Sequence, residues 1–232
     1  MLSIVIPCYN EEERLPRTVE QIERFLDGKD AGYELILVDD GSSDGTRMVM
    51  DAAAERNRFV RLEALPHNRG KGRALAEGVA AAKGSEVLVT DADLSTPIEE
   101  LPKLQAELEK GAGVAIASRA LRGSRVEVSQ PVYRVLMGKA FNLLVQAVLL
   151  PGIWDTQCGF KLFRADVAHD AFAQLTTDGF GYDPEVLYRA KQRGVRIAEV
   201  PVVWRNSAPT KVSPIKSSLD MFKHVLRVRF RG

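Results

Sequence analysis

Cysteine and histidine are scarce in this sequence. Among 232 residues there are two cysteines, Cys8 and Cys158, and three widely separated histidines. Two cysteines are too few for the disulfide framework of a small secreted domain, so we expect reduced thiols and a cytoplasmic protein. The spacing of these residues does not match a zinc site.

An excess of charge of one sign is also absent. Charged residues make up 27% of the chain, and the formal net charge is +1. We therefore predict no nucleic-acid partner, and any further argument from charge has to be local.

No apolar run has the length of a membrane-spanning helix. The longest, residues 140–150, is interrupted by Asn142 and Gln146, and a spanning helix needs about 20 apolar residues. The N-terminal MLSIVIPCYN has no basic residues before its apolar ones, so we expect no signal peptide. Contact with a membrane surface stays open.

What the sequence does contain is an alternation of strand-like and helix-like segments. Apolar runs of strand length occur at residues 2–7, 33–40, 59–65, 85–93 and 113–119, with helical patterns at 15–26, 46–55, 71–83 and 97–110. After a polar loop at 120–131 we expect a helix at 132–150, a short strand within 154–164, a helix at 183–193 and a strand at 197–205. This order predicts a single α/β domain with a mostly parallel sheet and helices on both faces.

Four of these strands are followed by polar segments, namely PCYNEE, DDGSSDG, HNRGKG and DAD. Because ligands of open α/β sheets bind beyond the carboxyl ends of the strands, these segments together predict a binding site. In DDGSSDG, Asp39 and Asp40 could accept hydrogen bonds from a nucleoside, whereas Asp44 is expected to cap a helix. In HNRGKG, Gly70 and Gly72 would allow a ligand close approach, although a solvated loop is the simpler interpretation.

The DAD segment places Asp91 and Asp93 on the same side of an extended chain. Two carboxylates that close repel each other unless a cation lies nearby, and Mg²⁺ binds one or two carboxylates together with substrate phosphates. We therefore favour a metal site here over one capping and one solvated aspartate.

Several segments, in this order and spacing, resemble the family 2 glycosyltransferases with the Rossmann-like GT-A fold: SIVIPCYNEEERL, VDDGSSDGT, NRGKGRALAEG and DADLSTP. Further along, ASR, DTQCGFKLF and GYDPEVLY are similar to the branch that makes polyprenyl-phosphate sugars, nearest the dolichyl-phosphate glucose synthases. The resemblance implies a nucleotide-sugar-binding half at 1–119, an acceptor half at 120–210 and a basic amphipathic tail at 211–232.

The resemblance also implies roles for individual residues. Asp91 and Asp93, with Ala92 between them, would hold Mg²⁺ or Mn²⁺ on the donor diphosphate. Ser95 stands where related mannose synthases have a further ligand, Gln, so water would complete the metal's ligands. The nucleoside would contact Pro7, Tyr9, Glu11 and Asp39, with Lys71 near it. Arg119 and Arg134 would bind phosphates, and residues 121–130 would form a flexible acceptor loop.

The acceptor decides whether a base is needed. A lipid phosphate is already an oxyanion, whereas a hydroxyl acceptor requires a carboxylate base. Asp183 is the candidate base, with Asp155 behind it, and a helix-capping role for Asp183 is the alternative. Lys161 and Arg164 either line the acceptor pocket or lie solvated at a strand edge, and Cys158 is expected to be a buried, unreactive side chain.

The favoured function is an inverting, metal-dependent transfer of a hexose from UDP-glucose to a polyprenyl or dolichyl phosphate. The alternatives are a hydroxyl acceptor, GDP-mannose as donor, a nucleotidyltransferase and a non-catalytic binding protein. The expected tail helix, 215–230, has Ile215, Leu219, Phe222 and Leu226 on one face and basic residues on another. It could lie on an anionic membrane or dock on its own domain.

Overall fold

The computed structural model describes residues 1–27, 32–127, 132–205 and 224–230, with only the backbone for 132–135. The strands are β1 (Leu2–Cys8), β2 (Tyr33–Asp39), β3 (Val60–Ala64), β4 (Glu86–Val89), β5 (Val114–Ser118), β6 (Arg125–Val126), β7 (Lys161–Arg164), β8 (Ile197–Pro201) and β9 (Val203–Trp204). The helices are α1 (Leu15–Leu26), α2 (Thr46–Arg56), α3 (Lys71–Ala81), η1 (Ile98–Glu100), α4 (Leu101–Glu109), α5 (Val132–Val148), α6 (Ala165–Ala173) and α7 (Tyr182–Gln192).

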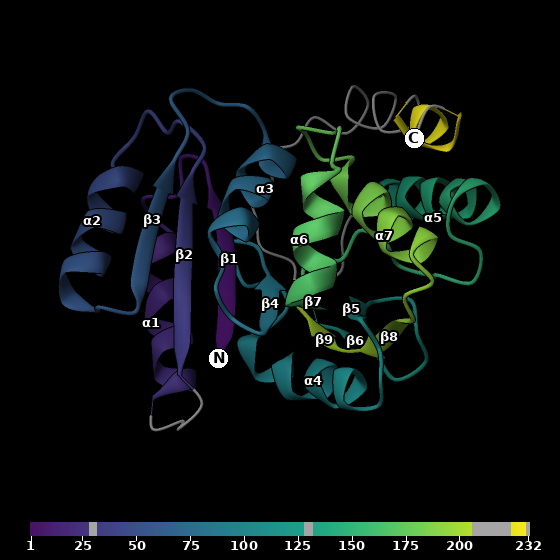
Figure 1. The fold of residues 1–232 in the computed structure, drawn as a ribbon, viewed down its shortest axis with the longest axis horizontal. Helices are drawn as coiled ribbons and strands as arrows, with labels where there is room; N and C mark the ends of the chain where they lie inside the picture. Colours follow the sequence, from purple (N-terminus) through teal and green to yellow (C-terminus); the bar gives the residue numbers. More distant parts are fainter. Residues whose placement is uncertain (28–31, 128–131, 206–223, 231–232) are drawn as a thin grey trace.

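A seven-stranded sheet in the order β3-β2-β1-β4-β7-β5-β8 forms the centre of the molecule (Figure 1). All neighbouring strands are parallel except β7, which runs antiparallel between β4 and β5. The register pairs Cys8 with Asp39 and Val5 with Val89, so the polar segments after β1, β2 and β4 meet at one edge of the sheet. The prediction of a mostly parallel α/β sheet is confirmed.

Helices cover both faces of the sheet. One apolar cluster joins α1, α2 and α4 to side chains such as Ile4, Leu35 and Leu88. The other joins α3, α5, α6 and α7 to side chains such as Val5 and Val89. Since neighbouring residues of a strand point to opposite faces, burial on both faces explains why the strands read as continuous apolar runs.

The second half of the chain differs in detail from the sequence prediction. The expected strand at 197–205 is divided into β8 and β9, and β9 pairs in parallel with β6, which lies inside the predicted polar loop. Helix α6 was not predicted. It follows β7 directly and packs Val167, Ala168, Ala171 and Phe172 against the sheet.

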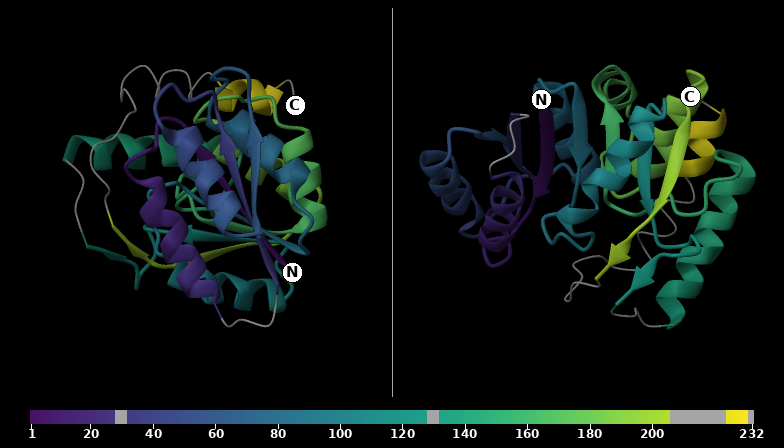
Figure 2. Two further views of the ribbon diagram at one scale, coloured as in Figure 1. Left: turned by 90° about the vertical axis from the view of Figure 1, so that its left-hand side faces the viewer. Right: turned by 90° about the horizontal axis from the view of Figure 1, so that it is seen from below.

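Residues 224–230 are helical and lie beside α7 (Figure 1). In the left view of Figure 2 this helix is the yellow segment near the label of the C-terminus. Val225 and Val228 are each only 2% exposed and pack in the cluster that contains α5, α6 and α7. This part of the tail therefore docks on its own domain through Val225 and Val228. Of the predicted apolar face, Leu226 is half-buried, and Ile215, Leu219 and Phe222 lie outside the described residues. Among the residues that the structure describes, none of the helices combines the length and apolarity needed to cross a bilayer.

Candidate active site

The DAD segment forms a tight turn directly after β4. The hydroxyl of Thr18 in α1 donates to the Ala92 carbonyl at 2.6 Å, and the backbone N–H of Ser95 donates to Oδ1 of Asp93 at 2.9 Å. Leu94 has a φ of 43°, in the left-handed region that non-glycine residues seldom adopt. Burial and the charge of Asp91 raise the pKa of Asp93, which is the result expected for two close carboxylates.

Lys71, the first residue of α3, forms an ion pair with Oδ1 of Asp91. Burial lowers the pKa of Lys71, but the charges of Asp91 and Asp183 raise it by more, so the net shift is upward and the ammonium form is favoured. The side chain of Lys71 therefore lies at the pair of carboxylates, Asp91 and Asp93, and is not solvated.

Three glycines allow the close packing around Asp91 and the start of α3, and the sequence analysis did not predict this role. A Cβ at Gly159, in the turn before β7, would collide with the carboxylate of Asp91. At Gly70 and Gly72, added Cβ atoms would meet the backbone of Thr177 and Asp178. These two glycines let the start of α3 pack against the segment before α7.

Asp39 and Asp40, although adjacent, have different surroundings. Asp40 accepts hydrogen bonds from the backbone N–H groups of Arg69 at 2.7 Å and Gly70 at 2.9 Å, and so fixes the HNRGKG loop. Asp39 accepts from the N–H of Ser42 at 2.9 Å through Oδ1 and is 7% exposed. Asp40 has a structural explanation, which leaves Asp39 as the candidate nucleoside contact.

The remaining predicted nucleoside contacts lie at the same edge of the sheet. Pro7 is near the end of β1, paired with Val38 in β2, and Tyr9 follows the strand with 41% of its surface exposed. Glu11 forms an ion pair with Arg14 at 2.7 Å. The prediction that Asp44 caps a helix is wrong, because Gly45 is the N-cap residue of α2 and no side chain caps it; Asp44 instead accepts from the backbone N–H of Thr46 at 3.0 Å.

Arg119 follows β5 and binds the carboxylate of Asp155 through two side-chain nitrogens, at 2.7 and 2.8 Å. Its guanidinium carbon lies 5.3 Å from the ring centroid of Trp204. Burial raises the pKa of Asp155, but Arg119 lowers it by more, so this carboxylate stays ionised. Arg134 lies in α5, and its side chain is outside the described residues.

Asp183 is held by a buried lysine. It lies in the first turn of α7, 5% exposed, and forms an ion pair with Lys161 of β7, which is fully buried. Lys161 also donates to the Cys158 carbonyl at 2.5 Å. The helix-capping prediction for Asp183 is wrong, because Gly181 is the N-cap residue and no side chain caps it. The alternative of a solvated Lys161 at a strand edge is also wrong, because β7 is an interior strand of the sheet. Arg164, at the end of the same strand, is exposed and forms an ion pair with Asp166.

A divalent cation fits the DAD segment chemically. Asp91 and Asp93 offer only oxygen ligands, which Mg²⁺ and Mn²⁺ prefer. In the described parts of the chain, no group of three His, Cys, Asp or Glu side chains could hold a metal ion by itself. The two carboxylates therefore suit a metal that takes its other ligands from water and a bound phosphate.

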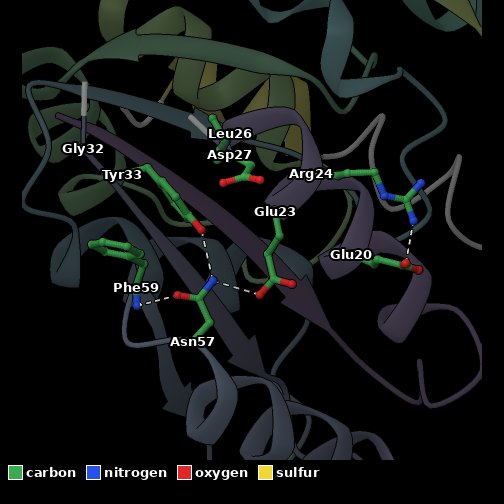
Figure 3. A pocket seen from close by; sticks show the side chains of 9 residues that line it. All are labelled: Glu20, Glu23, Arg24, Leu26, Asp27, Gly32, Tyr33, Asn57 and Phe59. Atoms are coloured by element: carbon green, nitrogen blue, oxygen red, sulfur yellow. Dashed lines mark hydrogen bonds and ion pairs between the residues drawn. The ribbon is translucent and has the colours of Figure 1, made fainter. Parts of the chain in front are cut away.

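A separate pocket of about 500 Å³ lies between α1, α2 and the start of β2 (Figure 3). Inside it, the side-chain amide of Asn57 donates to Glu23 at 2.9 Å and to the Tyr33 hydroxyl at 3.0 Å. Tyr33 begins β2 and Asp39 ends it, so this pocket is about 20 Å from the predicted site along the strand.

The sheet and the helices around it have the GT-A fold of solved glycosyltransferase structures. Glucosyl-3-phosphoglycerate synthase from Mycobacterium tuberculosis, solved in complex with uridine diphosphate, matches with a TM-score of 0.70 and 24% identity over 98% of this chain and 78% of that chain. Another structure of that enzyme, with Mn²⁺, uridine-diphosphate-glucose and phosphoglyceric acid, gives a TM-score of 0.71, 22% identity and the same coverage.

The sequence comparisons then identify the family. The chain matches the model for glycosyl transferase family 2 over residues 3–172, and it belongs to that family. It is 34% identical to a dolichyl-phosphate β-glucosyltransferase from Dictyostelium discoideum, over 99% of this chain and 74% of that protein. It is 35% identical to the human enzyme of the same name, over 99% of this chain and 75% of that protein. The prediction of a family 2 glycosyltransferase is confirmed.

Proposed function

We propose that this glycosyltransferase moves glucose from UDP-glucose to a polyprenyl phosphate such as dolichyl phosphate, with inversion at the sugar and with a divalent metal. The names of the dolichyl-phosphate β-glucosyltransferase relatives support the sugar and the acceptor. The uridine-diphosphate-glucose and Mn²⁺ in a structure of the same fold make UDP-glucose the donor to test first.

One observation about the site favours a phosphate over a hydroxyl acceptor. Both candidate bases already have cationic partners: Asp183 pairs with Lys161, and Asp155 binds Arg119 through both oxygens. A carboxylate held in this way is a poor proton acceptor, because protonation would leave its partner cation without a counterion. A phosphate oxygen needs no base: it bonds to the anomeric carbon as the bond to the diphosphate breaks, and no proton has to be removed.

The remaining roles follow from charge. Asp91 and Asp93 would hold the metal, which would supply positive charge to neutralise the diphosphate leaving group. Asp39, with Pro7, Tyr9 and Glu11 along the same edge, binds the nucleoside. Arg119 is fixed by Asp155 and offers its remaining N–H groups to a phosphate, and Arg134 provides a second guanidinium.

A lipid acceptor also agrees with the surface of α5. Leu136, Ala140, Leu143 and Ala147 are exposed and recur at helical spacing, so they form an apolar stripe. Leu136 is 61% exposed and Leu143 is 68% exposed. We propose that this stripe contacts the membrane that contains the acceptor.

The decisive experiment supplies radiolabelled UDP-glucose or GDP-mannose, with Mn²⁺, to two acceptors that differ only at the head: a polyprenyl phosphate and the corresponding polyprenol. We expect organic-extractable label only with UDP-glucose and the phosphate, and its loss when EDTA removes the metal. Label on the polyprenol would favour a hydroxyl acceptor, and label from GDP-mannose would change the donor. A severe loss of rate in Asp183→Asn with normal donor binding would restore Asp183 as a base.

A further inference from the structure

Lys71 forms an ion pair with the carboxylate of Asp91, which is one of the two ligands of the proposed metal site. Its ammonium group forms an ion pair with Oδ1 of Asp91, and the Lys71 and Asp91 side chains are 18% and 35% exposed. Lys71 begins α3 and Asp91 follows β4, so the packing of this helix on the sheet sets the pair. A metal ion that binds Asp91 therefore has to compete with a cation that belongs to the protein.

A second carboxylate near Lys71 is already neutralised. Asp183 contributes to the upward pKa shift of Lys71, but it forms its own ion pair with Lys161. The ring of Tyr182 lies close to both ammonium groups, with its centroid 5.4 Å from Nζ of Lys71 and 5.9 Å from Nζ of Lys161. Since Lys161 satisfies Asp183, Asp91 is left as the partner of Lys71.

We propose that Lys71 is an internal counterion that weakens metal binding at Asp91 until a nucleotide diphosphate is present, so that metal and nucleotide bind cooperatively. This inference rests on the proposed function, because it requires a nucleotide-sugar donor. The diphosphate gives Lys71 a new anionic partner, and Asp91 then becomes available to act with Asp93. By linkage, nucleotide must tighten metal binding by the same factor as metal tightens nucleotide binding.

The test measures free Mn²⁺ by electron paramagnetic resonance during titration of the full chain, with and without UDP. In the natural sequence we expect weak binding of Mn²⁺ alone and at least about tenfold tighter binding with UDP, within the usual range of such coupling. In Lys71→Met, Mn²⁺ alone should bind about tenfold tighter, which is about 1.4 kcal/mol. The effect of UDP should shrink accordingly. Lys71→Arg keeps the cation and should behave as the natural sequence does.

Two controls keep the result clear. Lys103→Met removes an exposed lysine that pairs with Glu100, and it should leave both affinities unchanged. Lys71→Gln repeats the loss of charge with a polar side chain, in case Lys71→Met does not fold. The inference is overturned if neither neutral variant binds Mn²⁺ alone more tightly, or if the effect of UDP is unchanged. If the natural sequence binds neither UDP nor Mn²⁺ with UDP, the proposed function itself fails.

Discussion

The ion pair between Lys161 and Asp183 gives a quantitative test of the site's packing. The Lys161 side chain is 0% exposed and that of Asp183 is 7% exposed. Replacing Lys161 with Met keeps much of its volume but leaves a buried carboxylate without its counterion and removes the hydrogen bond to the Cys158 carbonyl. Breaking a buried pair in this way costs about 3–5 kcal/mol of the free energy of unfolding. We expect Asp183→Asn to lower the free energy of unfolding by a similar amount, because it leaves the buried ammonium group of Lys161 without its counterion.

The double variant separates a buried charge from general damage. With both charges removed, as in Lys161→Met with Asp183→Asn, no ion is left buried alone, so the protein should recover most of what either single change loses. Urea unfolding followed by circular dichroism measures all three variants. Arg164→Met, on the same strand but in an exposed pair with Asp166, serves as the control and should leave the midpoint unchanged. A loss below about 1 kcal/mol for Lys161→Met, as is typical of exposed pairs, or strictly additive losses in the double variant, would refute the reasoning.

Three further predictions concern other parts of the site and its support. Asp91→Ala should abolish glucosyl transfer while the circular dichroism spectrum stays native, and metal-dependent turnover in this variant would contradict the metal assignment. Gly159→Ala should displace the Asp91 carboxylate and weaken Mn²⁺ binding in the presence of UDP, whereas Gly32→Ala should not, because Gly32 is exposed and has no atom within 4 Å of the added Cβ. Burial raises the pKa of Glu185, but hydrogen bonds from His224, Thr177 and Thr176 lower it by more, to about 2. The folded state therefore gains stability above the ordinary carboxyl pKa of 4.5 and loses it as the pH falls from there toward 2. Glu185→Gln should reduce that dependence in urea unfolding at pH 3 to 6.

The sequence predicted the parts of the fold that leave a local pattern. The strands β1, β2, β4 and β5 are apolar runs because both of their faces are buried. Asp39 ends β2, and Asp91 and Asp93 follow β4, so their position at the carboxyl edge could be inferred. The insertion of β7 between β4 and β5 could not be inferred, because a four-residue strand does not reveal its neighbours or direction.

The counterions of the site were also beyond local patterns. Arg119 and Asp155 are 36 residues apart, and Lys161 and Asp183 are 22 apart. Nothing in either local sequence marks the partner, so the sequence left Lys161 open between an acceptor pocket and a solvated strand edge, and Asp183 open between a base and a helix cap. The need for glycine at position 159 likewise could not be predicted, because it depends on contact with the Asp91 side chain, which is distant in sequence.

These pairings also locate the charge that the site lacks. Asp91, Asp155 and Asp183 each have a cationic partner within the described part of the chain, and Glu11 has Arg14. Asp93 has no ion pair there; it accepts a hydrogen bond from Ser95, and burial together with Asp91 raises its pKa. An added divalent cation would favour the ionised form of Asp93. It would also supply more charge than Lys71 provides at Asp91, so we expect a metal to bind next to Asp93 if the proposed function is correct.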